Sequence, residues 1–134
     1  MSVPTIWDEE HFDIQPSTIR GAGLGLFSRV TIRAGDTIGQ YTGKVITDRQ
    51  TYSPKYRDSL YVLWVCKDCN IVGEGPLANH TRYINHAAKP NARIVTSTRW
   101  KKARIEAIKR IPPGQEVFID YGPDYWEGLG VSAK

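Results

Sequence analysis

The feature that most limits the fold of this chain is how often its strand-like segments are interrupted by turn-forming residues. Twelve glycines and eight prolines are spread over 134 residues. The stretches between them are short and rich in β-branched and aromatic residues, as is typical of strands of about 4 to 8 residues. No segment has the apolar spacing of a long amphipathic helix. The sequence therefore predicts a mostly β domain built of short strands and small sheets.

Local patterns give the expected order of strands and turns. A glycine-rich turn in IRGAGLGLFSRV leads into a strand around Leu26 to Ser28, RAGD is a turn, and DTIGQYTGKVI gives one or two strands broken at Gly43. DRQTYSPKYRD is expected to be a loop with at most one helical turn, because Pro54 opposes more. LYVLWV is the strongest strand and is expected to be buried on both faces. We then expect a turn at CKDCN, a return strand in NIVGEG, strands in ARIVTSTR and KKARIEAIKRI, a turn at PPGQ and a last strand in EVFIDYG.

Length and composition fit one domain over residues 1–134, with a core of about 19–126 and short extensions. A chain of this length can bury a core without disulfides. The sequence has no apolar run of the ~20 residues that a membrane span needs, and MSVPTIWDEEHF has no secretory signal pattern. We therefore expect a cytoplasmic or nuclear protein without membrane contact. The net charge of +4 suits an acidic or nucleic-acid-associated partner without distinguishing between them.

Two motifs are weak evidence for a binding site when each is taken alone. Cys66 and Cys69 form a single CxxC, which is half of a tetrahedral zinc site, so plain thiols near a turn are favoured and no metal site is predicted. Redox or metal use of these thiols stays open. The GAGLG stretch (Gly21 to Gly25) would need a following helix to hold a nucleotide phosphate. It is followed by strand-like residues, so it is a tight turn or a place where backbone approaches another ligand.

Four stretches together are more specific. GAGLGLFS is followed by YTG (Tyr41 to Gly43), RYINHAAKPN (Arg82 to Asn91) and EVFIDYG (Glu116 to Gly122). In this order they resemble the SET domain of protein lysine methyltransferases, over about Ile19 to Trp126. With no cysteine-rich flank and no zinc-binding cysteine tail, the chain is similar to the compact viral and bacterial forms. The resemblance implies a β-clip of small sheets in which the C-terminal strand segment passes beneath the NH loop in a knot-like way.

The resemblance also implies S-adenosylmethionine as the cofactor. The side chain of Asn85 would hold its amino-acid end, and the backbone of His86 would meet the adenine edge, which a backbone N–H and C=O can read. Gly23, Leu24 and Gly25 would offer backbone to the methionine part. The alternative for His86 is a core histidine that shapes the loop.

Other cofactor-site residues follow from the same resemblance. Arg82 is expected to reach a carboxylate such as Glu116 or Asp120, with a surface cation as the alternative. Asn91 is expected to fix the loop. Tyr121 and Trp126 complete the predicted cofactor site.

Tyr121 of DYG matches the catalytic tyrosine of the family, with Tyr41 as a second catalytic candidate. Methyl transfer from a sulfonium needs a neutral amine, whereas free lysine has a pKa of about 10.4. Desolvation in an apolar channel disfavours the ammonium, so the site needs no strong base. The predicted channel residues are Tyr41, Tyr61, Ile94, Ile119 and Tyr125. Ile94 and Ile119 stand where some relatives carry a restricting tyrosine, which implies room for more than one methyl.

The implied partner is a lysine-containing protein, with a histone tail foremost, and a homodimer is plausible. The basic stretch RWKKAR (Arg99 to Arg104) is either a solvated hairpin tip or a contact to nucleosomal DNA. Nucleic acid is otherwise not expected as a partner. A viral protein or bacterial effector of this kind would act in the host nucleus. A binding module with a SET fold and no turnover is the alternative function.

Overall fold

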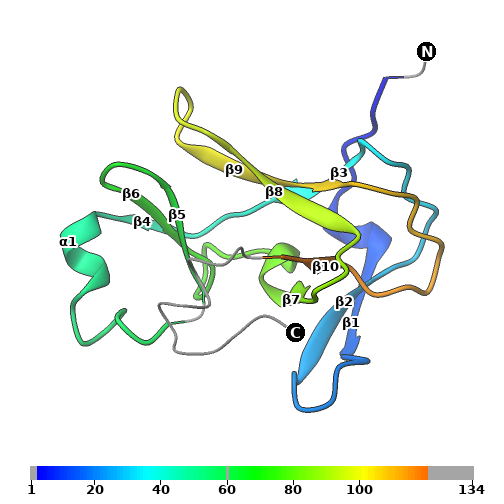
Figure 1. Cartoon of the computed structure of the whole chain (residues 1–134), viewed down its shortest axis with the longest axis horizontal. Coiled ribbons are helices and arrows are strands. Elements are labelled where there is room, and N and C mark those ends of the chain that lie inside the picture. The colour runs from blue at the N-terminus through cyan, green and yellow to red at the C-terminus, as the bar shows by residue number, and fades with distance from the viewer. Residues whose placement is uncertain (1–2, 60, 121–134) are drawn as a thin grey trace.

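A computed structural model describes residues 3–59 and 61–120 of the chain. These residues form small sheets around a short parallel pair (Figure 1). One antiparallel pair joins β1 (Phe12–Pro16) and β2 (Leu24–Ser28). One three-stranded sheet has the order β3 (Thr37–Gln40), β9 (Lys102–Ala107) and β8 (Ala92–Ser97). Another has the order β4 (Lys44–Ile46), β6 (Cys69–Val72) and β5 (Val62–Cys66). The parallel pair joins β7 (Asn85–His86) and β10 (Phe118–Ile119).

The described helices are single turns; the sequence predicted the one in DRQTYSPKYRD but not the other two. These helices are η1 (Glu9–His11), α1 (Asp48–Thr51) and η2 (His80–Tyr83). α1 begins with a capping box in which the Thr47 hydroxyl accepts from the Gln50 N–H and the Gln50 side chain accepts from the Thr47 N–H. The mostly β prediction is confirmed. None of the helices in the described ranges is long and apolar enough to cross a lipid bilayer.

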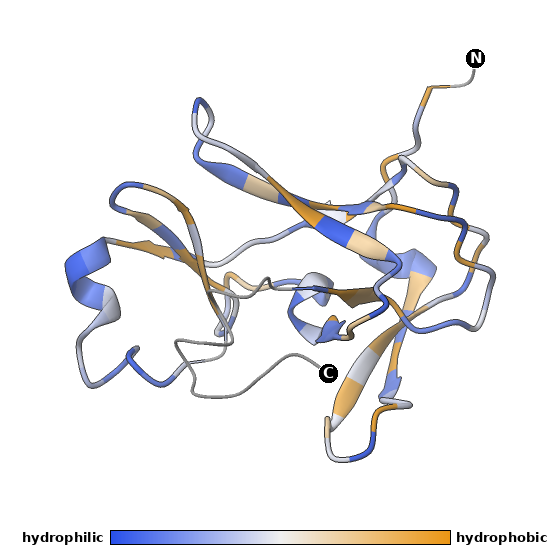
Figure 2. Ribbon diagram, viewed as in Figure 1, coloured by the Kyte–Doolittle hydropathy of each residue, from blue (hydrophilic) through white to orange (hydrophobic). Residues whose placement is uncertain are grey.

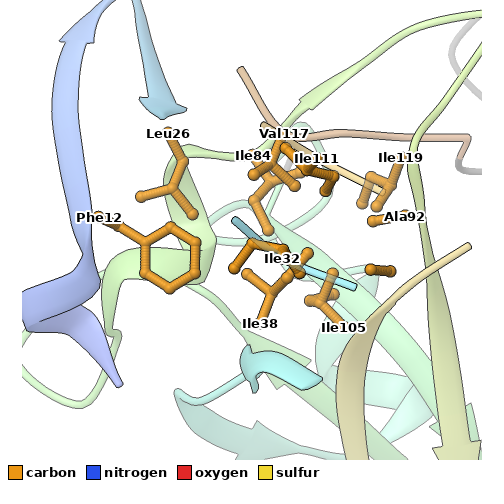
Figure 3. Packing of buried hydrophobic residues seen from close by; sticks show 11 residues of the cluster. Phe12, Leu26, Ile32, Ile38, Ile84, Ala92, Ile105, Ile111, Val117 and Ile119 are labelled. Carbon is orange, nitrogen blue, oxygen red and sulfur yellow. The ribbon is translucent and has the colours of Figure 1, made fainter. Parts of the chain in front are cut away.

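The main hydrophobic core collects buried side chains from β1, β2, β3, β8, β9 and β10 and from the loops between them (Figure 3). Leu26, Ile38 and Ile105 are fully buried there, on β2, β3 and β9. Phe12 of β1, which is 7% exposed, packs into the same cluster. The packed unit therefore begins before Ile19, where the sequence placed the start of the core.

The N-terminal segment is held by one buried carboxylate. Asp36, at the end of the predicted RAGD turn, accepts from the Thr5 N–H at 2.9 Å and from the Trp7 indole N–H at 3.1 Å. It also accepts from the Arg33 N–H of its own turn at 3.0 Å. Burial alone would raise the pKa of Asp36, but these hydrogen bonds hold it below the ordinary value. The carboxylate thus joins residues 5–7 to the turn that precedes β3.

The prediction that LYVLWV is buried on both faces is wrong. The segment forms β5, which is an edge strand, and Trp64 on it is 61% exposed. The central strand of that sheet is β6, in which all four residues are buried. Both strands are rich in hydrophobic residues (Figure 2), so hydropathy alone does not identify the central one. Within this sheet, β6 alone has a neighbouring strand on each side. This position, rather than hydropathy, determines which strand is enclosed.

Candidate functional site

Three of the four motif stretches meet beside the parallel pair. The amide nitrogen of Asn85 on β7 donates to the carbonyl oxygen of Leu24 at 2.9 Å and to Oε2 of Glu116 at 3.1 Å. Because both neighbouring oxygens can only accept, the NH₂ group of the amide, and not its oxygen, has to face them. The two amide hydrogens are used, and among the described contacts Oδ1 is left to accept from a ligand. The glycine stretch, the NH motif and the start of EVFI therefore form one site.

Glu116 lies at the centre of this arrangement and is only 4% exposed. Its carboxylate accepts from the Ser17 hydroxyl at 2.7 Å, the Thr18 N–H at 2.8 Å and the Thr18 hydroxyl at 2.7 Å. Burial by itself would raise the pKa of Glu116, but the hydrogen bonds from Thr18, Ser17 and Asn85 lower it below the ordinary value of 4.5. The group is therefore ionised at neutral pH. Sequence reasoning considered Glu116 only as a partner for Arg82, although an acid inside the apolar segment EVFI was a signal.

Gly25 is required at this point because there is no space for a side chain. A Cβ at Gly25 would overlap Oε2 of Glu116 and would lie 3.3 Å from Nδ2 of Asn85. Gly23, two residues earlier, has a φ of +76°, which a side chain disfavours. The stretch runs directly into strand β2. It therefore lacks the following helix that a phosphate-binding turn needs, and Gly25 serves close packing against the side chains of Glu116 and Asn85.

The NH loop and the C-terminal segment are joined along their length. In the parallel register Phe118 lies beside Asn85 and Ile119 beside His86. Asn91 donates from Nδ2 to the Glu116 carbonyl at 2.8 Å, and its Oδ1 accepts from the Phe118 N–H at 2.8 Å. Asn91 thus fixes the loop as predicted. These contacts place residues 116–119 against the NH loop, where the expected knot-like arrangement has them.

His86 lies partly enclosed beside an acid. Its side chain is 11% exposed, and Nδ1 is 3.7 Å from Oδ1 of Asp120. Burial lowers the pKa of His86 below its ordinary value of 6.5, and the nearby Asp120 charge opposes this shift. The imidazole is therefore neutral at neutral pH. A neutral, partly enclosed ring is compatible with the alternative given above, in which His86 shapes the loop.

A second group of side chains surrounds Tyr41. The Tyr41 hydroxyl donates to the Tyr61 carbonyl oxygen at 2.6 Å. A Cβ at Gly73 would overlap that hydroxyl, so the glycine makes space for it. The backbone of Tyr61 also accepts from the Gly73 N–H at 2.9 Å. Two predicted channel residues, Tyr41 and Tyr61, are thus directly connected.

Arg82 differs from its predicted contact. Its guanidinium carbon lies 5.1 Å from the ring centre of Tyr61 and 5.1 Å from that of Tyr83. No ion pair within residues 3–59 and 61–120 includes it. Glu116, which the sequence offered as its partner, is engaged by hydroxyls and amides instead. A guanidinium stacks well on aromatic faces, so Arg82 joins the Tyr61 group.

The remaining predicted residues fall into two sets. Ile94 lies half-buried between the main core and a second cluster that includes Tyr41. Ile119 is 2% exposed inside the main core. Tyr121, Tyr125 and Trp126 lie outside the described residues.

Comparison with known proteins agrees with this arrangement. Residues 23–122 match the SET domain family. The chain is 29% identical over 120 residues to a SET domain-containing protein of Phaeosphaeria nodorum, which covers 86% of this chain and 18% of that protein. It is 30% identical over 110 residues to histone-lysine N-methyltransferase NSD3 of Mus musculus, covering 76% of this chain and 8% of the other. It is 31% identical over 106 residues to histone-lysine N-methyltransferase Set2 of Drosophila melanogaster, covering 74% and 5%.

The chain therefore spans less than a fifth of the length of these relatives. The family match, by contrast, covers well over half of this chain; it includes three of the motif stretches whole and the glycine stretch from Gly23 onward. On that match, the chain belongs to the SET domain family.

Proposed function

We propose that this protein is an S-adenosylmethionine-dependent protein lysine N-methyltransferase. The observation that carries the proposal is the amide of Asn85: Leu24 and Glu116 engage both amide hydrogens, which leaves Oδ1 as an acceptor for a ligand. An acceptor of this kind fits the α-ammonium of an amino-acid ligand. The space beside Gly23, where an added Cβ would meet nothing within 4 Å, fits a methionine chain that lies close to the glycine stretch. NSD3 and Set2 are both named histone-lysine N-methyltransferases.

The cofactor, when bound, supplies a methyl group on a positively charged sulfur. The protein has to present a lysine amine in its neutral form, in line with that methyl group. Aromatic side chains around Tyr41 and Tyr61 disfavour a charged ammonium by desolvation. The Arg82 guanidinium over Tyr61 opposes it further by like charge. We assign to the Tyr121 hydroxyl the orientation of the amine nitrogen, and to Tyr41 the wall of the channel.

Alignment then supplies much of the rate. Well-oriented intramolecular reactions reach effective molarities of about 10⁵ M or more. His86, being neutral, adds no charge beside the cofactor. We assign its backbone to the adenine edge, with Trp126 and Tyr125 covering the cofactor and the channel.

The finer assignments are part of the same proposal. We propose a histone tail lysine as the substrate and, because Ile94 and Ile119 are aliphatic, the addition of more than one methyl. Mass spectrometry of the modified peptide would count the methyl groups. We also propose a homodimer in a cytoplasmic or nuclear setting, which light scattering after size exclusion would test.

The decisive experiment is transfer of labelled methyl from S-adenosylmethionine to core histones and histone-tail peptides. Wild type is compared with Tyr121→Phe, and with Tyr52→Phe as a matched control, because Tyr52 is 79% exposed. We expect label on lysine with wild type and the control, and strong loss with Tyr121→Phe. Calorimetry with Asn85→Ala should show weaker cofactor binding.

Two results would contradict the proposal. Cofactor binding without transfer to any histone or peptide would favour a SET-fold binding module, or a substrate outside this panel. No cofactor binding by the folded wild type would remove the assigned roles of Asn85, Gly25 and His86 together.

A further inference from the structure

A groove of about 420 Å³ lies on the outer face of the β3–β9–β8 sheet, away from the residues of the candidate site. Side chains alternate along β9, so Ala103 and Ile105 face the core while Lys102 and Arg104 face outward. The register places Val95 and Gln40 on either side of Arg104. Ile6 and Trp100 also line the groove.

The groove exposes large apolar side chains. Trp100 is 65% exposed and Ile6 is 79% exposed, and the two residues are far apart in the sequence. Val95 of β8, opposite Arg104, also lines the groove and is half-buried. Apolar side chains gathered in a hollow, with polar groups around it, are typical of an interaction site.

The groove is also positively charged. Lys102 and Arg104 line it, and none of its described lining residues is acidic. Arg104 shares the single carboxylate of Glu106 with Arg93, at 2.7 and 2.8 Å, so two guanidiniums face one acid. Arg99 stacks on Trp100 at 4.9 Å and adds another cation at the rim.

We propose that this groove binds an acidic, extended peptide segment of a partner protein. One bulky apolar side chain of the peptide would lie between Trp100, Val95 and Ile6, with acidic residues beside it against Lys102 and Arg104. Duplex DNA fits less well, because phosphate contacts need cations and gain nothing from an apolar pocket. The proposal does not depend on the methyltransferase activity, since the groove shares no residue with that site.

The test uses the full chain and fluorescein-labelled ten-residue peptides. Each has one phenylalanine, leucine or tryptophan among aspartates and glutamates, and its matched versions have asparagine and glutamine for the acids or alanine for the apolar residue. Fluorescence polarisation should show binding that weakens with salt and with either matched version. Trp100→Ala should weaken it about 30-fold, as for a central aromatic residue of an interface. Lys102→Glu should weaken it as well.

The controls are matched in type and exposure. Trp64→Ala removes a tryptophan that is 61% exposed on another sheet, and Lys44→Glu reverses an exposed charge on β4. Both should bind as wild type does. Circular dichroism has to show that every variant is folded.

Four outcomes would overturn the proposal. They are no binding by any acidic peptide, binding that Trp100→Ala leaves unchanged, a 20-base-pair duplex that binds more tightly and is lost in the same variants, and a dimer that Trp100→Ala dissociates. The third would identify a nucleic-acid surface, and the fourth a second copy of the chain as the occupant.

Discussion

The carboxylate of Glu116 receives hydrogen bonds from Ser17 and Thr18, which lie 99 and 98 positions earlier in the chain, and from Asn85. A buried carboxylate with several donors is stable only while every donor keeps its acceptor. Gly25 leaves the space that this arrangement occupies. Single side chains therefore decide whether the glycine stretch and the NH motif stay in contact.

Replacing this carboxylate tests the arrangement at residue scale. Glu116→Gln replaces one carboxylate oxygen by an NH₂ group, which cannot accept the hydrogen bonds that the surrounding donors offer. Because buried donors are then left without acceptors, the free energy of unfolding should fall by about 2 kcal/mol. Cofactor affinity should fall too, because the Asn85 amide loses an acceptor. Urea unfolding and calorimetry would measure the two effects. Glu10→Gln, at an exposed glutamate, is the control and should change neither.

The pH dependence of the same variant has a definite sign. The folded pKa of Glu116 lies below 4.5, so its contribution to stability is complete above pH 4.5 and is lost as the pH falls through the folded value. The stability difference between wild type and Glu116→Gln should therefore shrink in acid. A difference that grows in acid would mean that the carboxyl is protonated in the folded protein.

At the scale of elements, β7 and β10 are too short to be stable alone. Each has two residues, and their pairing is reinforced by Asn91, which contacts the backbone at Glu116 and Phe118. Hydrogen bonds from one loop side chain thus take the place of the further backbone hydrogen bonds that longer strands would form.

Asn91→Ala should loosen this pairing. Hydrogen exchange at residues 116–119 should accelerate, because two buried hydrogen bonds worth about 1 kcal/mol each are lost. Asn70→Ala is the matched control: Asn70 is also buried and donates to the Ile46 carbonyl and to Asp48. In the Asn70→Ala variant, hydrogen exchange should accelerate in β4 and β6, while residues 116–119 should stay as protected as in the wild type. Equal effects of both variants on β10 would show that the loop does not hold it.

The elements also show which parts of the fold a sequence can reveal. The hairpin of β8 and β9 and the turns at Gly35 and Gly114 follow from local residue types, and both glycines have the positive φ that such turns need. β1 was missed because only Phe12 of its five residues is buried. β7 was missed because its partner lies 33 residues away. Arg82 was assigned to a carboxylate because sequence gives no distance to an aromatic ring.

At the scale of the whole molecule, the N-terminal segment belongs to the core. Phe12 packs with residues from β2, β3, β9 and β10, although the family match begins only at residue 23. The motif order was sufficient to predict the family, but not that Ser17, Thr18 and Asn85 meet at Glu116. It carried no information on Phe12, Trp7 or the groove at Trp100, because these lie outside the motifs.

Phe12→Ala should lower the free energy of unfolding of the whole domain by about 3 to 5 kcal/mol, as is usual for a buried phenylalanine. A single shifted transition, seen alike by circular dichroism and tryptophan fluorescence, would indicate one cooperative unit. Ile14→Ala on the same strand, where Ile14 is 47% exposed, is the control and should cost much less. Separate transitions for the two probes would instead mean that β1 unfolds on its own.

The contacts of Glu116 with Ser17 and Thr18 also set an order of events during synthesis. A ribosome releases residues from the N-terminus onward, so β2 and the NH loop leave the exit tunnel before residues 116–119 do. The hydrogen-bonded arrangement around Glu116 therefore forms only when nearly the whole described chain is free. Contacts between such distant residues also slow folding. A nascent chain that stops before Glu116 retains the groups of the Asn85 contact with the Leu24 carbonyl oxygen, but it lacks the carboxylate that joins Ser17, Thr18 and Asn85.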